Sequence, residues 1–347
     1  MRFLQSKKSI LFLVTLVFSG LLSTSAQDSL KTVTAQKGDG ILSLLRRHGV
    51  NPYEAYEEFV GLNIENLKNS TQLYAGRDYK IPLGTETTPV SEEQSRNEET
   101  GAKGENFPIF GKKYNPVYRK SERLKGTVYY LVAGHGGPDP GAMTTYSGQS
   151  IAEDEYAYDI TLRLARELIT HGALVYVIIR DKDDGIRDQR VLKIDHDEVA
   201  YPNKTIPLNQ RERLKQRVDV VNKLHQKYKG KFQRLIVTHI DSRSKGQNID
   251  VFFYHHKKSK NGKRLAESIH KTFKQKYNKY QPNRTYSGTF ENRTSLYMVK
   301  NTHPATAFIE IGNIRNKKDQ QRILEPDNRQ ALAKWISEGI LLDYESR

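Results

Sequence analysis

The sequence contains no cysteine, and it has one tryptophan and three methionines among its 347 residues. Disulfide bonds are therefore excluded, and any metal site must use histidine nitrogens and carboxylate oxygens in place of thiolates. A chain of this length can bury enough apolar surface to fold without disulfides, and it is long enough for two domains.

Long apolar runs are also scarce, and the one exception lies at the start of the chain. Residues 1–26 combine basic residues with an apolar run from Ile10 to Leu22 and with small residues that end at Ala26. This pattern is typical of a cleavable signal peptide, because the run is short for a membrane span. An uncleaved membrane anchor is the alternative. We expect an exported protein, periplasmic or extracellular, without a membrane anchor after cleavage.

Acidic residues are outnumbered by basic ones, 40 to 56, which gives a formal net charge of +16. Glutamates gather in the polar stretch 84–107, so the positive charge lies mostly in the C-terminal part of the chain. A basic exported protein favours an anionic polymer or surface. Export argues against nucleic acid as a partner and favours the cell wall, whose peptides carry free carboxylates. Solubility alone is the alternative explanation of the charge.

The first globular region is expected at 28–83. Its hydrophobic pattern predicts a strand at 30–36, helices at 40–50 and 51–62, and a strand at 77–83. The motifs "VTAQKGDGILSLLRRHGV" and "LYAGRDYKIP", with Asn63 between them, resemble a LysM domain, the small glycan-binding module of cell-wall proteins. Gly40 departs from this family, in which a hydroxyl residue usually stands there. A domain that kept the fold and lost the ligand is the alternative.

Residues 84–115 are predicted to be a flexible linker, and residues 116–347 a second domain. Strand-like and helix-like segments alternate in this second domain. Such alternation predicts an α/β fold, with a mainly parallel sheet flanked by helices. The expected strands are 127–133, 173–180, 234–238, 249–254, 296–300 and 305–311, and the expected helices are 153–172, 209–228, 262–277 and 327–344.

Four polar side chains are expected at one edge of this sheet, because ligands of open α/β sheets bind beyond the carboxyl ends of the strands. His135 and His239 follow two of the strands, and Glu310 lies near the end of a third. Glu153 begins the helix that returns from the first strand. Two histidines and one glutamate can hold Zn2+ and leave a fourth position for water. A second glutamate can accept the proton of that water, which is the chemistry of amide hydrolysis.

The glycines around His135 have two alternative explanations, a phosphate cradle and a tight turn with an incidental histidine. A phosphate loop is disfavoured, because no Lys-Ser or Lys-Thr pair follows the glycines. Glycines also permit a sharp turn that leaves room for a substrate beside a metal.

Five motifs then occur in order over residues 126–345: "AGHGGPDPGA", "EDEYAYDITLRLAREL", "LKQRVDVVN", "IVTHIDS" and "PATAFIEIGNIRN". They resemble the catalytic domain of the zinc-dependent N-acetylmuramoyl-L-alanine amidases, the amidase_3 family. The resemblance implies Zn2+ on His135, Glu153 and His239, with Glu310 as the catalytic carboxylate. It also implies cleavage of the peptidoglycan amide between N-acetylmuramic acid and L-alanine of the stem peptide.

The sequence departs from this family at Val132, at 240–242 and in a long insertion at 184–207. The insertion could be a lid, a regulatory segment or surface decoration. The need for an activator protein is left open. Two other functions use the same residues: a zinc peptidase that cuts within wall peptides, and a non-catalytic wall-binding protein.

Two assignments also have alternatives at the level of single residues. Glu155 is the competing metal ligand, and Ser150 with Glu153 fits a helix capping box. The triplet "DHD" at 195–197 is either a second metal site or a solvated loop.

Overall fold

The computed structural model describes residues 30–36, 39–50, 52, 55–68, 72–82, 104–242 and 246–347. The chain forms two units, separated between Thr87 and Thr88. The predicted signal peptide, 1–26, and residues 84–103 of the predicted linker lie outside the described residues.

The N-terminal unit contains two helices and a two-stranded antiparallel sheet in which Val33 faces Tyr79. The side chains of Leu44, Phe59 and Ile81 are fully buried between these elements. Asn63 joins the second helix to the last strand, because its Oδ1 accepts from Lys80 N at 2.8 Å and its Nδ2 donates to Lys80 O at 2.6 Å. In chain order the elements are β1 (Leu30–Thr34), α1 (Ile41–Arg47), α2 (Tyr56–Asn63), η1 (Ile64–Asn66) and β2 (Asp78–Pro82).

The order strand, helix, helix, strand is the one predicted from the sequence. The second helix begins at Tyr56 with Ala55 as its N-cap, later than the predicted start at residue 51. Asn51, the expected cap, lies outside the described residues.

A six-stranded sheet forms the centre of the C-terminal unit, in the order β12-β11-β13-β10-β3-β6. The neighbouring strands pair in parallel, except that β11 and β13 are antiparallel. The predicted fold, a mainly parallel sheet flanked by helices, is therefore confirmed. The strands are β3 (Thr127–Ala133), β6 (Leu174–Val177), β10 (Phe232–Asp241), β11 (Val251–His255), β12 (Thr289–Asn292) and β13 (Ala305–Asn313).

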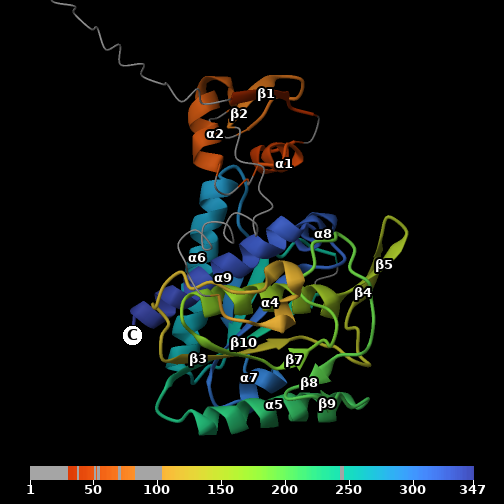
Figure 1. Cartoon of the computed structure of the whole chain (residues 1–347), viewed down its shortest axis with the longest axis vertical. Helices are drawn as coiled ribbons and strands as arrows, with labels where there is room; N and C mark the ends of the chain where they lie inside the picture. The colour runs from red at the N-terminus through yellow and green to blue at the C-terminus, as the bar shows by residue number, and fades with distance from the viewer. Residues whose placement is uncertain are drawn as a thin grey trace, which may run out of the picture. The chain divides into compact units, whose positions relative to one another are not determined.

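Helices cover both faces of this sheet (Figure 1). On one face α4 (Glu153–Thr170) packs on β3 and β10, α6 (Lys260–Tyr280) packs on β11 and β13, and α9 (Pro326–Glu345) contacts both helices. On the other side lie α5 (Gln210–Lys227) and α7 (Tyr297–Asn301) (Figure 1). Among the described residues, no helix combines the length and the apolar character needed to cross a membrane.

Smaller elements surround the sheet. Residues 104–115, at the end of the predicted linker, contain two 3-10 helices and bury Phe110 and Tyr114. The remaining elements are η2 (Pro108–Phe110), η3 (Lys112–Tyr114), the hairpin of β4 (Met143–Tyr146) and β5 (Gln149–Ala152), the small sheet of β7 (Ile179–Arg180), β8 (Val199–Ala200) and β9 (Lys204–Thr205), and α8 (Lys317–Leu324).

Two predicted strands are wrong in detail. The segment 296–300 was expected as a strand, but its residues 297–300 form most of helix α7, which buries Met298 and Val299. A run of five residues that mixes polar and apolar side chains does not distinguish the helical period of 3.6 residues from the strand period of two. The predicted strand 173–180 is two strands, because β6 pairs with β3 whereas β7 pairs with β8.

Candidate metal centre

His135 lies in the loop that follows β3, with its backbone in the left-handed region at φ 61°. The neighbouring Gly134 donates its N–H to Thr238 O on β10 at 2.7 Å, which fixes the loop to the end of the sheet. A Cβ atom at Gly134 would lie 2.5 Å from Nδ1 of His239 and would overlap its ring. A glycine is therefore needed where the loop passes the second histidine.

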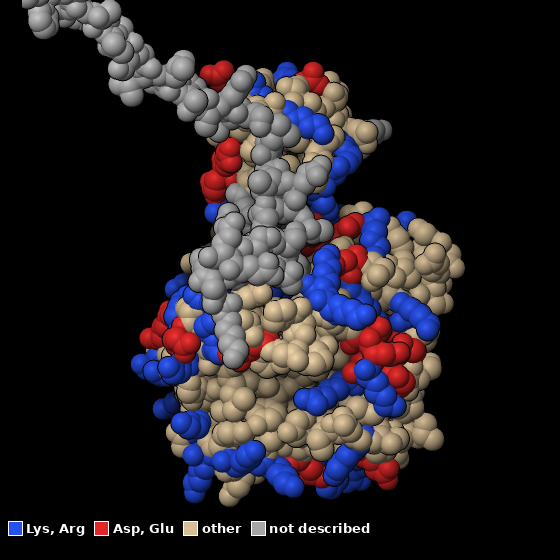
Figure 2. Space-filling model, in the orientation of Figure 1, with Lys and Arg blue, Asp and Glu red and all other residues tan. Residues whose placement is uncertain are grey.

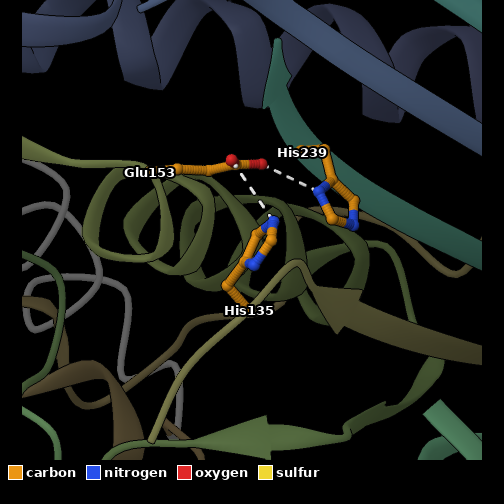
Figure 3. A group of neighbouring side chains, drawn as sticks. All are labelled: His135, Glu153 and His239. Carbon is orange, nitrogen blue, oxygen red and sulfur yellow. Dashed lines mark hydrogen bonds and ion pairs between the residues drawn. The ribbon is translucent and has the colours of Figure 1, made fainter. Parts of the chain in front are cut away.

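Glu153 is the first residue of α4, and its backbone N–H donates to Ala142 O at 2.9 Å. Its carboxylate lies between the two histidines (Figure 3). Oε2 is 3.3 Å from Nε2 of His135, and Oε1 is 2.8 Å from Nδ1 of His239. The backbone N–H groups of Ala142 and Ile240 also donate to the two oxygens, at 3.0 and 3.1 Å. The carboxylate is thus held in one orientation by two backbone N–H groups and by the two imidazole rings.

His239 belongs to β10, which continues to Asp241 and is longer than the predicted strand 234–238. Its ring stacks on Phe308 with the centroids 4.8 Å apart. His239 is in register with Glu310 on β13, so the two side chains leave the same face of the sheet.

The charges at this cluster favour a cation. Burial raises the pKa of Glu153, but hydrogen bonds from His135 and His239 outweigh it and hold that pKa well below its usual range. Burial also opposes protonation of His135, yet the carboxylates of Asp139 and Glu153 raise its pKa to about 10. Burial lowers the pKa of His239. The two carboxylates thus hold a proton on His135, and a bound metal cation would take the place of that proton.

Asp139 and two arginines support the loop that carries His135. Oδ2 of Asp139 lies 3.0 Å from Nδ1 of His135 and accepts from Nη2 of Arg213 at 2.7 Å. Arg217, which is buried, donates from Nη2 to the carbonyl oxygen of His135 at 2.6 Å. Sequence reasoning missed Asp139, although its position four residues after His135 in a tight turn was a usable signal. Arg217 thus supports the loop, and it also lines the cavity beside the cluster.

A cavity of about 640 Å³ opens beside the cluster, within the range of ligand pockets. It is lined by His135, Glu153, His239 and Glu310 together, so the four predicted site residues meet at one place. Arg293, Tyr254 and Arg315 line the same cavity. No residue of the insertion 184–207, all of which is described, lines it.

Glu155 is turned away from this cavity. Its Oε2 pairs with Nη1 of Arg187 at 2.9 Å, and its Oε1 accepts from Asp195 N at 3.0 Å. The capping box of Ser150 and Glu153 is also not formed, because α4 has Ala152 as its N-cap and Ser150 lies in β5.

The donor set fits a metal ion. One ligand atom from each of His135, Glu153 and His239 lies within 4.8 Å of the other two. Two imidazole nitrogens and a carboxylate oxygen are the ligands typical of catalytic zinc. A Cβ at Gly141 would lie 2.7 Å from the His135 ring and 2.9 Å from Oε2 of Glu153, so this glycine leaves the space around the cluster open.

Comparison with known proteins gives three likenesses. The chain is 24% identical over 219 residues to the germination-specific N-acetylmuramoyl-L-alanine amidase of Bacillus subtilis (strain 168), covering 63% of this chain and 80% of that protein. The structure of the CwlD amidase from Clostridioides difficile in complex with the GerS lipoprotein matches with a TM-score of 0.48 and 23% identity, over 63% of this chain and 98% of that one. The amidase AmiC2 of Nostoc punctiforme matches with a TM-score of 0.44 and 18% identity, over 65% of this chain and 99% of that one.

The family comparison covers the whole region that builds the cavity. Residues 130–341 match the family described as N-acetylmuramoyl-L-alanine amidase, from the loop of His135 to beyond the strand of Glu310. This match extends over more than half of the chain, and the chain therefore belongs to the N-acetylmuramoyl-L-alanine amidase family.

Proposed function

We propose that this protein is a zinc-dependent peptidoglycan amidase that cleaves the bond between N-acetylmuramic acid and L-alanine of the stem peptide. One observation carries the proposal. The Glu153 carboxylate lies between Nε2 of His135 and Nδ1 of His239 at a cavity that Glu310 also lines. Family membership indicates which bond is cleaved. The arrangement of these four side chains provides groups that suit hydrolysis of an amide bond.

His135, Glu153 and His239 would hold the metal. Bound zinc lowers the pKa of a water molecule and polarises a carbonyl oxygen. The chain's part is to fix the ligands, and the contacts of Glu153 with two backbone N–H groups serve that purpose. The ring of His239 is held in turn by stacking on Phe308.

Glu310 is the residue that would move the proton. Because Glu310 is in register with His239, its carboxylate faces the same cavity from the next strand. A carboxylate in this place can accept the proton of the attacking water and then donate it to the nitrogen of L-alanine as the bond breaks. No second ionisable group is needed for this transfer.

The cavity also suits an anionic substrate. Arg293 and Arg315 line it, and the guanidinium of Arg293 lies 5.0 Å from the centre of the Tyr254 ring. Stem peptides carry free carboxylates, which guanidinium groups bind well. The LysM resemblance of residues 28–83 adds a proposed contact with glycan strands, and the signal-like start of the chain adds proposed export to the periplasm or the medium.

The test is to digest purified peptidoglycan with the full chain and to identify the products by mass. We expect intact stem peptides that begin with L-alanine, which disappear with a chelator and return with Zn2+. Products cut within the stem would favour the peptidase alternative instead.

A variant separates catalysis from wall binding. We expect Glu310→Gln to lower the rate by at least about 100-fold while Zn2+ content and pelleting with peptidoglycan stay unchanged, because a positioned acid or base contributes about that factor or more. An unchanged rate would contradict the enzymatic proposal and favour a wall-binding protein.

A further inference from the structure

A second group of carboxylates lies at the N-terminus of α4, and none of its members lines the cavity. Asp154 and Glu155 come directly after the metal-site residue Glu153, and Glu198 comes from the segment between β7 and β8. One oxygen of each of these three side chains lies within 4.8 Å of the others. All three are buried, at 1%, 1% and 5% exposure.

The contacts of the group leave one oxygen without a partner. Oδ1 of Asp154 accepts from the Glu155 N–H at 2.9 Å. Oδ2 of Asp154 is buried and has no hydrogen-bond partner among the described residues. A buried carboxylate oxygen in this state is costly unless a cation or a proton binds it.

The other two carboxylates are already held in place. Glu155 is oriented by Arg187 and by the Asp195 N–H, and Oε2 of Glu198 accepts from the Gly137 N–H at 2.6 Å. Arg187 offsets one of the three negative charges. It also pairs with Asp184, so its charge is shared.

More negative charge adjoins the group. The oxygens of Asp181, Asp195 and Asp197 form a second triad within 4.8 Å of one another. Oδ1 of Asp195 and Oδ1 of Asp197 are also buried without a hydrogen-bond partner among the described residues. Since the Asp195 N–H donates to Glu155, the two triads are neighbours.

We propose that Asp154, Glu155 and Glu198 bind a hard divalent cation of the calcium type, separate from the His135 site. The donor set is all oxygen, which Ca2+ prefers and which lacks the imidazoles favoured by zinc. Calcium binds oxygens at about 2.4 Å, so ligand oxygens around one ion lie up to about 4.8 Å apart. The oxygens of the triad lie within this limit of one another.

At this location such an ion would stabilise the structure around the metal site. Asp154 follows the metal-site residue Glu153, and Glu198 is bonded to Gly137, two residues after His135. An ion here would join the insertion 184–207 to two of the three segments that carry metal-site residues, the loop of His135 and the start of α4. The insertion then stabilises the segments that carry His135 and Glu153 without entering the cavity. This agrees with its absence from the cavity lining.

The test uses the full chain, first loaded with Zn2+ so that the His135 site is filled, and titrates CaCl2 by isothermal calorimetry. We expect one Ca2+ per chain in the wild type and a rise in melting temperature of about 5 °C at saturating Ca2+. Neither readout depends on amidase activity, so a failure of the proposed reaction does not affect it. No calcium binding by the folded wild type would overturn the proposal, with protons neutralising the carboxylates instead.

Isosteric variants locate the ion. We expect Asp154→Asn and Glu198→Gln each to weaken Ca2+ binding at least 10-fold. Asp183→Asn is the matched control, because Asp183 is an exposed acid of the same segment, and it should bind as the wild type does. Equal weakening by Asp183→Asn, or loss with Asp195→Asn but not with Asp154→Asn, would overturn the assignment to this triad. A variant that fails to fold, judged by circular dichroism, leaves the decision to the wild-type titration and the second variant.

Discussion

Gly134 occupies a position where any side chain would overlap the ring of His239. We expect Gly134→Ala to cost about 1–3 kcal/mol of stability through overpacking, and to weaken Zn2+ binding at least 10-fold because the ring must move. Thermal melts and competition with a chromophoric chelator measure the two effects. Gly61→Ala is the control, because its Cβ would meet no atom within 4 Å. Zinc affinity equal to the wild type in Gly134→Ala would show that the ring is not fixed as described.

Asp139 acts on the metal site through His135. Its Oδ2 lies 3.0 Å from Nδ1, the nitrogen opposite to the one that faces Glu153. Losing such a partner of a metal-binding histidine typically costs 10–100-fold in metal affinity. We therefore expect Asp139→Asn to weaken Zn2+ binding by about 10-fold or more, measured by chelator competition. Asp219→Asn, at an exposed acid paired with Lys215, should leave the affinity unchanged.

At the scale of elements, Asp159 joins α4 to α9. It is fully buried, and its Oδ2 accepts from Nε of Arg163 at 2.8 Å and from Nε of Arg329 at 2.6 Å. Arg329 also donates to the carbonyl oxygens of Arg187 and Gln189, so the same cluster holds the insertion. Removing one partner of a buried ion pair leaves an uncompensated charge.

We expect Asp159→Asn to lower the free energy of unfolding by about 3–5 kcal/mol. Denaturant unfolding at neutral pH measures this loss. Asp188→Asn provides a comparison at a half-buried acid of the same region, where the expected loss is smaller. Equal losses in the two variants would argue against a special role for burial at Asp159.

The stabilisation from Asp159 should also depend on pH. Burial raises the pKa of Asp159, but Arg163 and Arg329 outweigh it and hold the pKa below its usual value. A depressed pKa in the folded state means that the stabilisation is complete above about pH 4 and is lost as the pH falls further. The difference in unfolding free energy between wild type and Asp159→Asn should be constant from pH 7 to about 5 and shrink below about 4. A constant difference down to pH 3 would contradict the assigned ion pair.

At the scale of the whole molecule, the chain carries a formal net charge of +16. On the face in Figure 2, basic side chains occur along the lower edge of the C-terminal unit, where α5 lies, and also across the face above it, with acidic side chains between them. No single basic patch stands out on this face. This face is therefore suited to diffuse attraction to an anionic polymer.

Binding to the cell wall should consequently weaken with salt. We expect less protein to pellet with peptidoglycan as NaCl rises from about 0.05 to about 0.5 M, because the screening length shortens several-fold over such a range. Peptidoglycan whose carboxylates have been amidated is the control and should show a weaker dependence. Pelleting that is independent of salt on native peptidoglycan would assign the attraction to the glycan alone.

Much of the fold followed from local patterns. The strand Thr127–Ala133 and the helix Glu153–Thr170 match the prediction closely, because long apolar runs and clear helical periods define them. The short segment 296–300 was predicted wrongly as a strand, and only its packing as α7 decides its form. The position at which β10 ends was also not predictable from a local pattern, because pairing with β13 extends the strand through His239.

The sequence by itself determined that His135, His239 and Glu310 lie at or near the carboxyl ends of strands, and this is why they were predicted to share one edge of the sheet. Only the tertiary structure decided that Glu153 faces the histidines while Glu155 faces Arg187, since both choices fit the start of one helix. It also decided that the insertion contacts Gly137 and Glu155 without lining the cavity, and that Asp139 supports His135. These outcomes depend on contacts between distant segments, which no local period or spacing specifies.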